Sequence, residues 1–199
     1  MTSPHVERLT SLCVFCGSSA GADPRHRDAA MRLGRQMAEA GVELVFGGGH
    51  LGLMGALAEA TLGAGGRVVG VIPEHLMRAE AAFLEISELI VVDSMHTRKR
   101  RMFEMAEAFC VLPGGLGTLD ETFEILTWKQ LRLHNKPVVL ANLDGYWSPW
   151  LALIDGIVGG GFAQPDVNRL FSVVDDVDAV LDTARAEIGA ALSGDSRLF

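Results

Sequence analysis

The sequence predicts an α/β fold in which a doubly wound, Rossmann-like parallel sheet carries helices on both faces. Short apolar runs of strand length recur along the 199 residues, stretches with helical periodicity separate them, and glycine-bearing turns follow several of the runs. Strands that are apolar throughout are buried on both faces, as in parallel sheets covered by helices. Such sheets bind ligands beyond the carboxyl ends of their strands.

The predicted strands are rich in Val, Ile, Leu and Phe, and they occupy residues 12–16, 42–46, 67–72, 89–92, 109–112, 137–142 and 170–174. Helical periodicity predicts helices over residues 28–40, 51–62, 96–108 and 119–133. Three glycines at 159–161 separate two further helical segments. No repeat or low-complexity linker breaks the alternation, so we expect one domain over residues 1–199.

The charge balance argues against a nucleic-acid polymer as a partner. The chain has 25 Asp and Glu against 17 Lys and Arg, a net charge of -8, and every phosphate contact needs a cation. The longest uncharged stretch, residues 44–58, contains five glycines and a histidine, so it lacks the roughly 20 apolar residues that cross a bilayer. The N-terminus has no apolar signal core, and we expect a cytoplasmic protein without a membrane partner.

Two of the three cysteines form a C-x-x-C pattern, Cys13 and Cys16. They lie within an apolar run, and in a strand their odd separation directs the two side chains to opposite faces. This favours buried thiols over a redox or metal site.

Three glycine-bearing turns follow predicted strands, at residues 16–19, 47–52 and 113–118. Glycine lets backbone N–H groups approach an oxyanion, and the N-terminus of the next helix adds a positive dipole, so a phosphate is the expected ligand. Residues 47–52 also match G-x-G-x-x-G, which keeps an NAD(P)-dependent oxidoreductase open. Against it, the loop follows the second strand, and Glu74 comes after Pro73 and does not end the next strand.

A basic segment follows the fourth strand, with Ser94 as a plausible N-cap and four cations at residues 98–101. Cations in a first turn oppose the helix dipole by about 0.3–1 kcal/mol each unless an anion offsets them. Arg98 and Lys99 therefore either bind an anionic ligand or belong to a solvated turn, and the pattern leaves both open.

Glu121 also has two interpretations. Thr118 and Glu121 have the spacing of a capping box, in which the glutamate returns to the cap residue. A carboxylate one turn into a helix, beside an anion-binding loop, can instead act on a neighbouring part of the ligand. Metal-ligand spacing, a G-x-x-x-x-G-K motif and a G-x-S-x-G nucleophile are all missing from the sequence, so we expect neither metal nor cofactor.

Together these segments resemble one family. Residues 113–121, PGGLGTLDE, resemble the P-G-G-x-G-T-x-x-E signature of the LONELY GUY (LOG) family, the cytokinin riboside 5′-monophosphate phosphoribohydrolases. Residues 94–99, 47–55, 16–19 and 70–80 are similar to further family motifs in the same order, and the likeness covers about residues 10–180. His50 and Asp120 depart from the residues common in the family.

The resemblance implies hydrolysis of the N-glycosidic bond of cytokinin riboside 5′-monophosphates and AMP, giving free base and ribose 5-phosphate. It implies Glu121 and Arg98 as catalytic residues and a homodimer in which Glu80 acts from the neighbouring chain. The implied substrate-binding residues are Glu80, Lys99, Gly114, Gly115, Leu116, Gly117, Thr118, Leu119, Asp120, Gly17, Ser18, Gly48 and Gly49. Some relatives carry a lysine decarboxylase label, but no lysine here has a context that suggests pyridoxal phosphate. A nucleotide-binding protein without catalysis also stays open.

Overall fold

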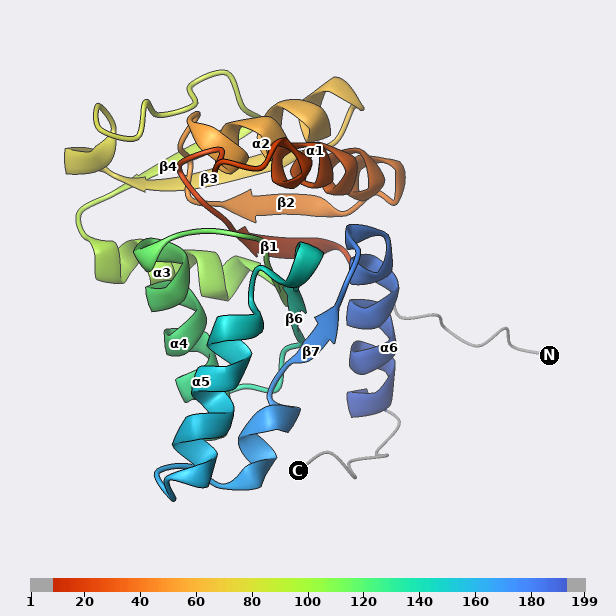
Figure 1. The fold of residues 1–199 in the computed structure, drawn as a ribbon. Coiled ribbons are helices and arrows are strands. Elements are labelled where there is room, and N and C mark those ends of the chain that lie inside the picture. The colour runs from red at the N-terminus through yellow and green to blue at the C-terminus, as the bar shows by residue number, and fades with distance from the viewer. Residues whose placement is uncertain (1–8, 193–199) are drawn as a thin grey trace.

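The computed structural model describes residues 9–192, which form a seven-stranded parallel sheet between two layers of helices (Figure 1). The strands are β1 Ser11–Phe15, β2 Glu43–Phe46, β3 Val68–Pro73, β4 Glu88–Val92, β5 Ala108–Val111, β6 Val138–Ala141 and β7 Ser172–Val174. Their order in the sheet is β4-β3-β2-β1-β5-β6-β7, and each neighbouring pair is parallel. The predicted Rossmann-like α/β fold is confirmed, and each predicted strand is present.

The helices are α1 Pro24–Glu39, α2 Gly52–Gly63, α3 Met95–Met105, α4 Leu116–Gln130, α5 Ser148–Gly159 and α6 Val180–Leu192. Helices α1, α2 and α6 cover one face of the sheet, and α3, α4 and α5 cover the other. Helix α1 begins before the predicted start because the Asp23 side chain accepts from the Arg25 N–H and Pro24 occupies the first turn. No helix of the described residues combines the length and apolar character needed to cross a membrane.

The sheet separates two hydrophobic cores, and β1 contributes alternately to each. Leu12 and Val14 belong to the core under α1 and α2, whereas Phe15 packs against α3 and α4. The free thiols of Cys13 and Cys16 also belong to different cores, as their spacing predicts. Burial raises the pKa of both thiols, so they are inert side chains of the interior.

The strand order reverses between β1 and β5, and the loops that follow these strands meet there. The Gly17 N–H donates to the Pro113 carbonyl at 3.0 Å, and the Gly17 carbonyl accepts from the Leu53 N–H at 3.0 Å. Three segments distant in sequence thus join at the carboxyl edge of the sheet, where open α/β sheets bind ligands.

Candidate active site

A cavity of ≈ 190 Å³ opens at this edge, between the ends of β1 and β2 and the first turns of α3 and α4. Both residues expected to be catalytic line it, together with many of those expected to bind substrate. These lining residues are Arg98, Glu121, Glu80, Gly17, Ser18, Gly115, Leu116, Gly117 and Thr118. The structure therefore gathers in one place residues from four separate segments of the sequence.

Arg98 enters the cavity from α3 as a buried cation. The Ser94 side chain caps the helix by accepting from the Thr97 N–H at 3.2 Å. Arg98 is only 4% exposed, and Nη2 of its guanidinium donates to the Gly47 carbonyl at 2.9 Å and to Glu80 at 3.2 Å. A Cβ at Gly47 would lie 2.1 Å from that nitrogen. Glycine at this position therefore makes room for the guanidinium, and its carbonyl and Glu80 compensate the buried charge.

Glu80 belongs to the segment that crosses over the loop after β2. The His50 N–H lies 3.2 Å from the Glu80 carbonyl, and residues 49 and 82 form an antiparallel bridge. Its carboxylate reaches Arg98 of its own chain. The structure thus brings Glu80 to the cavity of its own chain. Its expected action from a neighbouring chain stays a prediction.

Glu121 is not a capping residue, so that interpretation of its spacing is wrong. Helix α4 begins at Leu116 with Gly115 as its N-cap, which puts Thr118 in the first turn and Glu121 in the second. Thr118 is buried, and its hydroxyl oxygen lies 2.1 Å from the position that a Cβ at Gly114 would take. This close packing of the loop starts the helix before the predicted cap, and the Glu121 carboxylate is left to face the cavity.

The surroundings raise the pKa of Glu121 to about 7, chiefly because the carboxylate is withdrawn from water. The positive charge of Arg98 acts in the opposite direction, and the negative charge of Glu80 adds to the rise. Within residues 9–192, no side chain forms a hydrogen bond or ion pair with the Glu121 carboxylate. A positive charge that develops in the cavity would stabilise the ionised form of this carboxylate. The carboxyl group changes its charge near neutral pH.

The start of α4 has the open backbone that an anion site requires. Within 4 Å of a Cβ at Gly115 or Gly117 there is nothing, and Leu116 is 85% exposed. The first N–H groups of a helix have no partner inside it, and here the backbone around them is open to a ligand.

Other residues expected to bind substrate lie outside this cavity. Lys99 forms ion pairs of 3.1 Å with Asp120 and with Glu124 on α4. Gly48 packs against Ile72, and Gly49 packs against Met54 and the backbone of Glu80. Leu119 packs against the core under α3 to α5, and Gly114 lines a second cavity. Contacts from these residues to substrate stay predictions.

Three methionines form part of the cavity wall. Met54, Met95 and Met102 line the cavity together with Cys16. Met95 and Met102 precede and follow Arg98 by three and four residues on α3, a spacing that places side chains on one helix face. Once Arg98 is assigned to the site, this spacing in the sequence predicts that Met95 and Met102 line the site as well.

Comparison with known proteins identifies the family of the chain. A family model described as "Possible lysine decarboxylase" matches residues 54–184. The probable cytokinin riboside 5′-monophosphate phosphoribohydrolase LOGL9 of Oryza sativa subsp. japonica is 46% identical over 177 residues, 89% of this chain and 78% of that protein. The cytokinin riboside 5′-monophosphate phosphoribohydrolase LOG7 of Arabidopsis thaliana is 46% identical over 163 residues, 82% of this chain and 75% of that protein.

Among solved structures, the molybdenum cofactor carrier protein of Chlamydomonas reinhardtii superposes with a TM-score of 0.68 at 23% identity. The match covers 92% of this chain and 99% of that chain. At this identity the likeness supports the fold.

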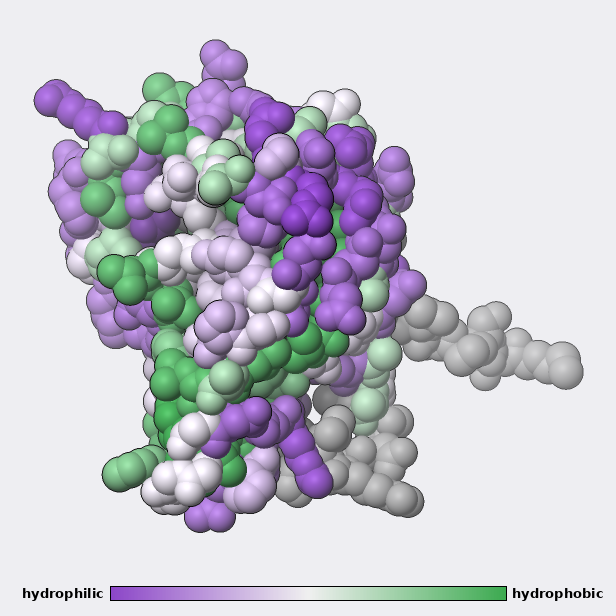
Figure 2. All heavy atoms as spheres, in the orientation of Figure 1, coloured by the Kyte–Doolittle hydropathy of each residue, from purple (hydrophilic) through white to green (hydrophobic). Residues whose placement is uncertain are grey.

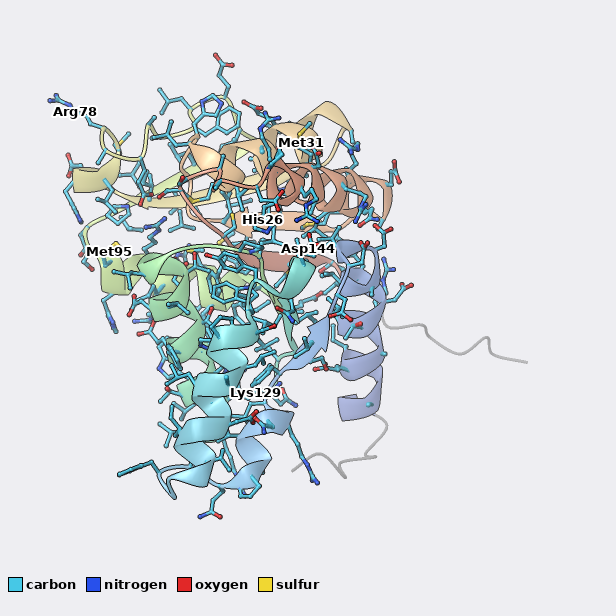
Figure 3. All side chains as sticks on the ribbon, viewed as in Figure 1. His26, Met31, Arg78, Met95, Lys129 and Asp144 are labelled. Carbon is cyan, nitrogen blue, oxygen red and sulfur yellow. The ribbon has the colours of Figure 1, made fainter. Side chains whose placement is uncertain are left out.

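The lysines do not fit the pyridoxal phosphate that a lysine decarboxylase uses. That cofactor is held by a Schiff-base lysine, and the sequence has only Lys99, Lys129 and Lys136. None of them lines the cavity. Lys99 is ion-paired with α4, and Lys136 donates to the Phe103 carbonyl at 2.6 Å. Lys129, near the end of α4, lies apart from the cavity residue Met95 in Figure 3.

Proposed function

Since the chain belongs to the LONELY GUY (LOG) family of cytokinin riboside 5′-monophosphate phosphoribohydrolases, we propose that it hydrolyses the N-glycosidic bond of purine nucleoside 5′-monophosphates. The substrates are cytokinin riboside 5′-monophosphates and AMP, and the products are free base and ribose 5-phosphate. The observation that carries the proposal is one cavity containing Arg98, Glu121 and the open start of α4.

The reaction breaks the bond between C1′ of ribose and the base nitrogen. As this bond breaks, positive charge develops on the ribose, and the Glu121 carboxylate stabilises that charge or orients the attacking water. The water oxygen bonds to C1′, and a proton goes to the departing base. Arg98 stabilises negative charge on the phosphate or on the leaving base, and the loop before α4 holds the 5′-phosphate and so fixes the sugar.

The test is incubation with AMP, with isopentenyladenosine monophosphate and with adenosine, followed by chromatography of the released base. We expect base from both nucleotides and little from adenosine. If neither nucleotide yields base while both bind, the protein is a nucleotide-binding protein without this activity. If NAD(P) binds tightly and the nucleoside monophosphates do not, the oxidoreductase alternative replaces the proposal.

We also propose a homodimer. Exposed apolar side chains occur on α4, on α5 and just beyond each helix: Leu116, Leu131, Leu133, Leu153 and Phe162. Figure 2 shows hydrophobic residues gathered over the part of the surface formed by α4 and α5, whereas α1 presents a hydrophilic surface. Exposed apolar patches commonly mark contacts between proteins. Light scattering at micromolar concentration should give twice the chain mass, and the mass of a monomer would contradict the proposal.

A cytoplasmic location is supported by the three cysteines, which are free thiols, as expected in a reducing compartment. Cell fractionation tests it, and recovery in a membrane or secreted fraction would contradict it.

A further inference from the structure

Three carboxylates lie close together on α4. They are Asp120, Glu121 and Glu124, and the stretch that contains them is little more than one helical turn long. Residues three and four apart are neighbours on a helix surface, so Glu124 lies near both of the others. Like charges at this spacing disfavour one another's ionised forms. The role proposed for Glu121 requires an ionised carboxylate, and this acidic stretch therefore requires a compensating cation.

Lys99 provides that cation from α3, the helix next to α4 (Figure 1). Its Nζ lies 3.1 Å from Asp120 Oδ2 and 3.1 Å from Glu124 Oε2. The side chains of Lys99 and Glu124 are 17% and 22% exposed, so solvent screens this pair less than a pair on the open surface. Partial burial lowers the pKa of Lys99, but its hydrogen bonds to Asp120 and Glu124 outweigh that effect and raise the pKa above its ordinary value. Lys99 is therefore charged at neutral pH.

Arg98 and Lys99 are consecutive on α3 but point in different directions. Successive side chains of a helix are about 100° apart, and here Arg98 lines the cavity whereas Lys99 faces α4. Cations near the start of a helix are unfavourable unless an anion offsets them. For Lys99 the offsetting anions are carboxylates of the protein, so its position requires no ligand.

Charged groups from three parts of the chain act on Glu121. Withdrawal from water is the main cause that raises its pKa, Arg98 opposes this rise, and Glu80 adds to it. Asp120 also raises the pKa of Glu121, and Lys99 lowers it. The nearby titratable groups of β1 are buried thiols, neutral because burial raises the pKa of each: Cys13 and Cys16. Lys99 is thus the cation that faces the acidic stretch from outside the cavity.

We propose that Lys99 is a positioning residue that ties α3 to α4 and neutralises Asp120 and Glu124, so that Glu121 faces the cavity as an ionised carboxylate. This rests on the proposed function, in which that carboxylate stabilises the ribosyl cation. Lys99 then acts on catalysis through α4 and does not touch the substrate.

Lys99→Met tests the proposal, because methionine keeps an unbranched side chain between the helices and removes the charge. Asp120 and Glu124 are then uncompensated, and the midpoint of the dependence of kcat on pH should rise from about 7 to about 8. As a result, kcat for AMP should fall about 10-fold at pH 6 and stay within about 2-fold at pH 9. A rate reduced by the same factor at every pH would show a structural role alone and would overturn the proposal.

Two further variants identify charge as the cause of the shift. Lys99→Arg keeps the cation, and its midpoint should stay at about 7. Combining Lys99→Met with Asp120→Asn and Glu124→Gln removes all three charges and should return the midpoint to that value. Arg100→Met, which breaks an ion pair of 2.8 Å with Glu104 on the same helix, is the matched control and should leave the profile unchanged.

Binding measurements separate this role from direct contact with the substrate. At pH 9, where Glu121 is ionised in both proteins, calorimetric titration of Lys99→Met with ribose 5-phosphate and with adenine should give dissociation constants within about 2-fold of the wild type. A larger rise in either constant would place Lys99 against the substrate and would overturn the proposal.

A titration without turnover separates the proposal from the proposed function. The carboxyl carbon NMR signal of Glu121, identified by its absence in Glu121→Gln, should titrate at about 7 in the wild type and at about 8 in Lys99→Met. The same shift in a protein that releases no base would retain the role of Lys99 and overturn the activity. If the wild type hydrolyses AMP but both proteins titrate alike, the role of Lys99 is wrong.

Should Lys99→Met melt early, Asp120→Asn provides a second test with the opposite sign. The Asp120 side chain is 59% exposed, so the substitution leaves the core unchanged. It removes a like charge beside Glu121 while Lys99 stays, and the Glu121 midpoint should fall below that of the wild type. An unchanged midpoint would overturn the proposal.

Discussion

The loops after β2 and after β5 are both rich in glycine and both precede a helix, yet they use glycine differently. In residues 47–52 the missing side chains make room for the protein itself. A Cβ at Gly47 would lie 2.1 Å from Arg98, and a Cβ at Gly52 would lie 2.4 Å from the Ser18 backbone. In residues 113–118 only Gly114 is packed in this way, and Gly115 and Gly117 face open space.

The difference shows what a glycine motif can and cannot indicate. The G-x-G-x-x-G pattern of residues 47–52 meets the needs of packing, because it allows the loop, Arg98 and the segment after β1 to approach one another. The loop after β5 has fewer glycines but leaves its backbone accessible at a helix start, where an anion is favoured. The number of glycines in a loop therefore does not show whether its backbone is open to a ligand.

The largest effect is expected from a substitution on α4, the helix that follows residues 113–118. Glu121→Gln keeps the size of the side chain and removes its charge, so kcat for AMP should fall by roughly 100-fold or more. The melting temperature should not fall. Glu104→Gln, at a glutamate on α3 that pairs with Arg100, is a matched control and should leave kcat unchanged. A Glu121→Gln enzyme that turns over AMP at the wild-type rate would remove the catalytic role of this residue.

In the packed loop, Gly52→Ala should act on folding. Gly52 has a φ of +63°, which L side chains adopt at a cost, and the added methyl would meet the Ser18 and Ser19 backbone. Strain and overpacking together should lower the free energy of unfolding by about 2 kcal/mol or more. Urea denaturation measures it. If the variant were as stable as the wild type, residues 47–52 would be able to move away from the Ser18 and Ser19 backbone. The two glycine loops would then not differ in how tightly they are packed.

The matching change in the open loop, Gly117→Ala, should affect binding and not folding. A Cβ there has no neighbour within 4 Å, so the urea midpoint should be unchanged. The methyl group enters the cavity, and KM for AMP should rise roughly 3- to 10-fold, up to about 1.4 kcal/mol of binding free energy. The two glycines would prove equivalent if Gly117→Ala unfolded as early as Gly52→Ala.

The pH dependence of Glu121 gives a smaller effect on stability. Its pKa of about 7 in the folded protein lies above the ordinary value of 4.5, so between these values the folded state binds more protons than the unfolded state. The protonated carboxyl therefore contributes fully to the free energy of unfolding below about pH 4.5, and this contribution is lost as the pH rises through 7. Glu121→Gln should unfold with a free energy about 1 kcal/mol or more above the wild type at pH 8.5 and equal to it at pH 4.5.

The same titration should control the rate. Because the ionised carboxylate stabilises the ribosyl cation, kcat should rise with pH through about 7. A rate that is flat from pH 5.5 to 8.5 would contradict this.

The smallest expected effect is that of metal removal. The described residues contain no group of three or more His, Cys, Asp or Glu side chains placed to hold a metal ion. Dialysis against EDTA should leave kcat/KM for AMP unchanged. Activity that disappears and returns with a divalent ion would show that the phosphate needs a cation beyond those of the protein.

The sequence by itself determined the sheet and the edge at which the site lies. Uninterrupted apolar runs must be buried on both faces, which fixes parallel strands between helices, and parallel strands place their following loops at one edge. The sequence alone therefore assigns Arg98, Glu121 and the glycine loops to a common region.

Only the tertiary structure decided which residues of each loop face the cavity. The start of α4 follows from Gly114 and Thr118 packing together, and this removes Glu121 from a capping role. Lys99 is turned toward α4 by acidic partners 21 and 25 residues away in sequence. Side-chain direction depends on contacts between segments distant in the chain, and local sequence patterns do not contain that information.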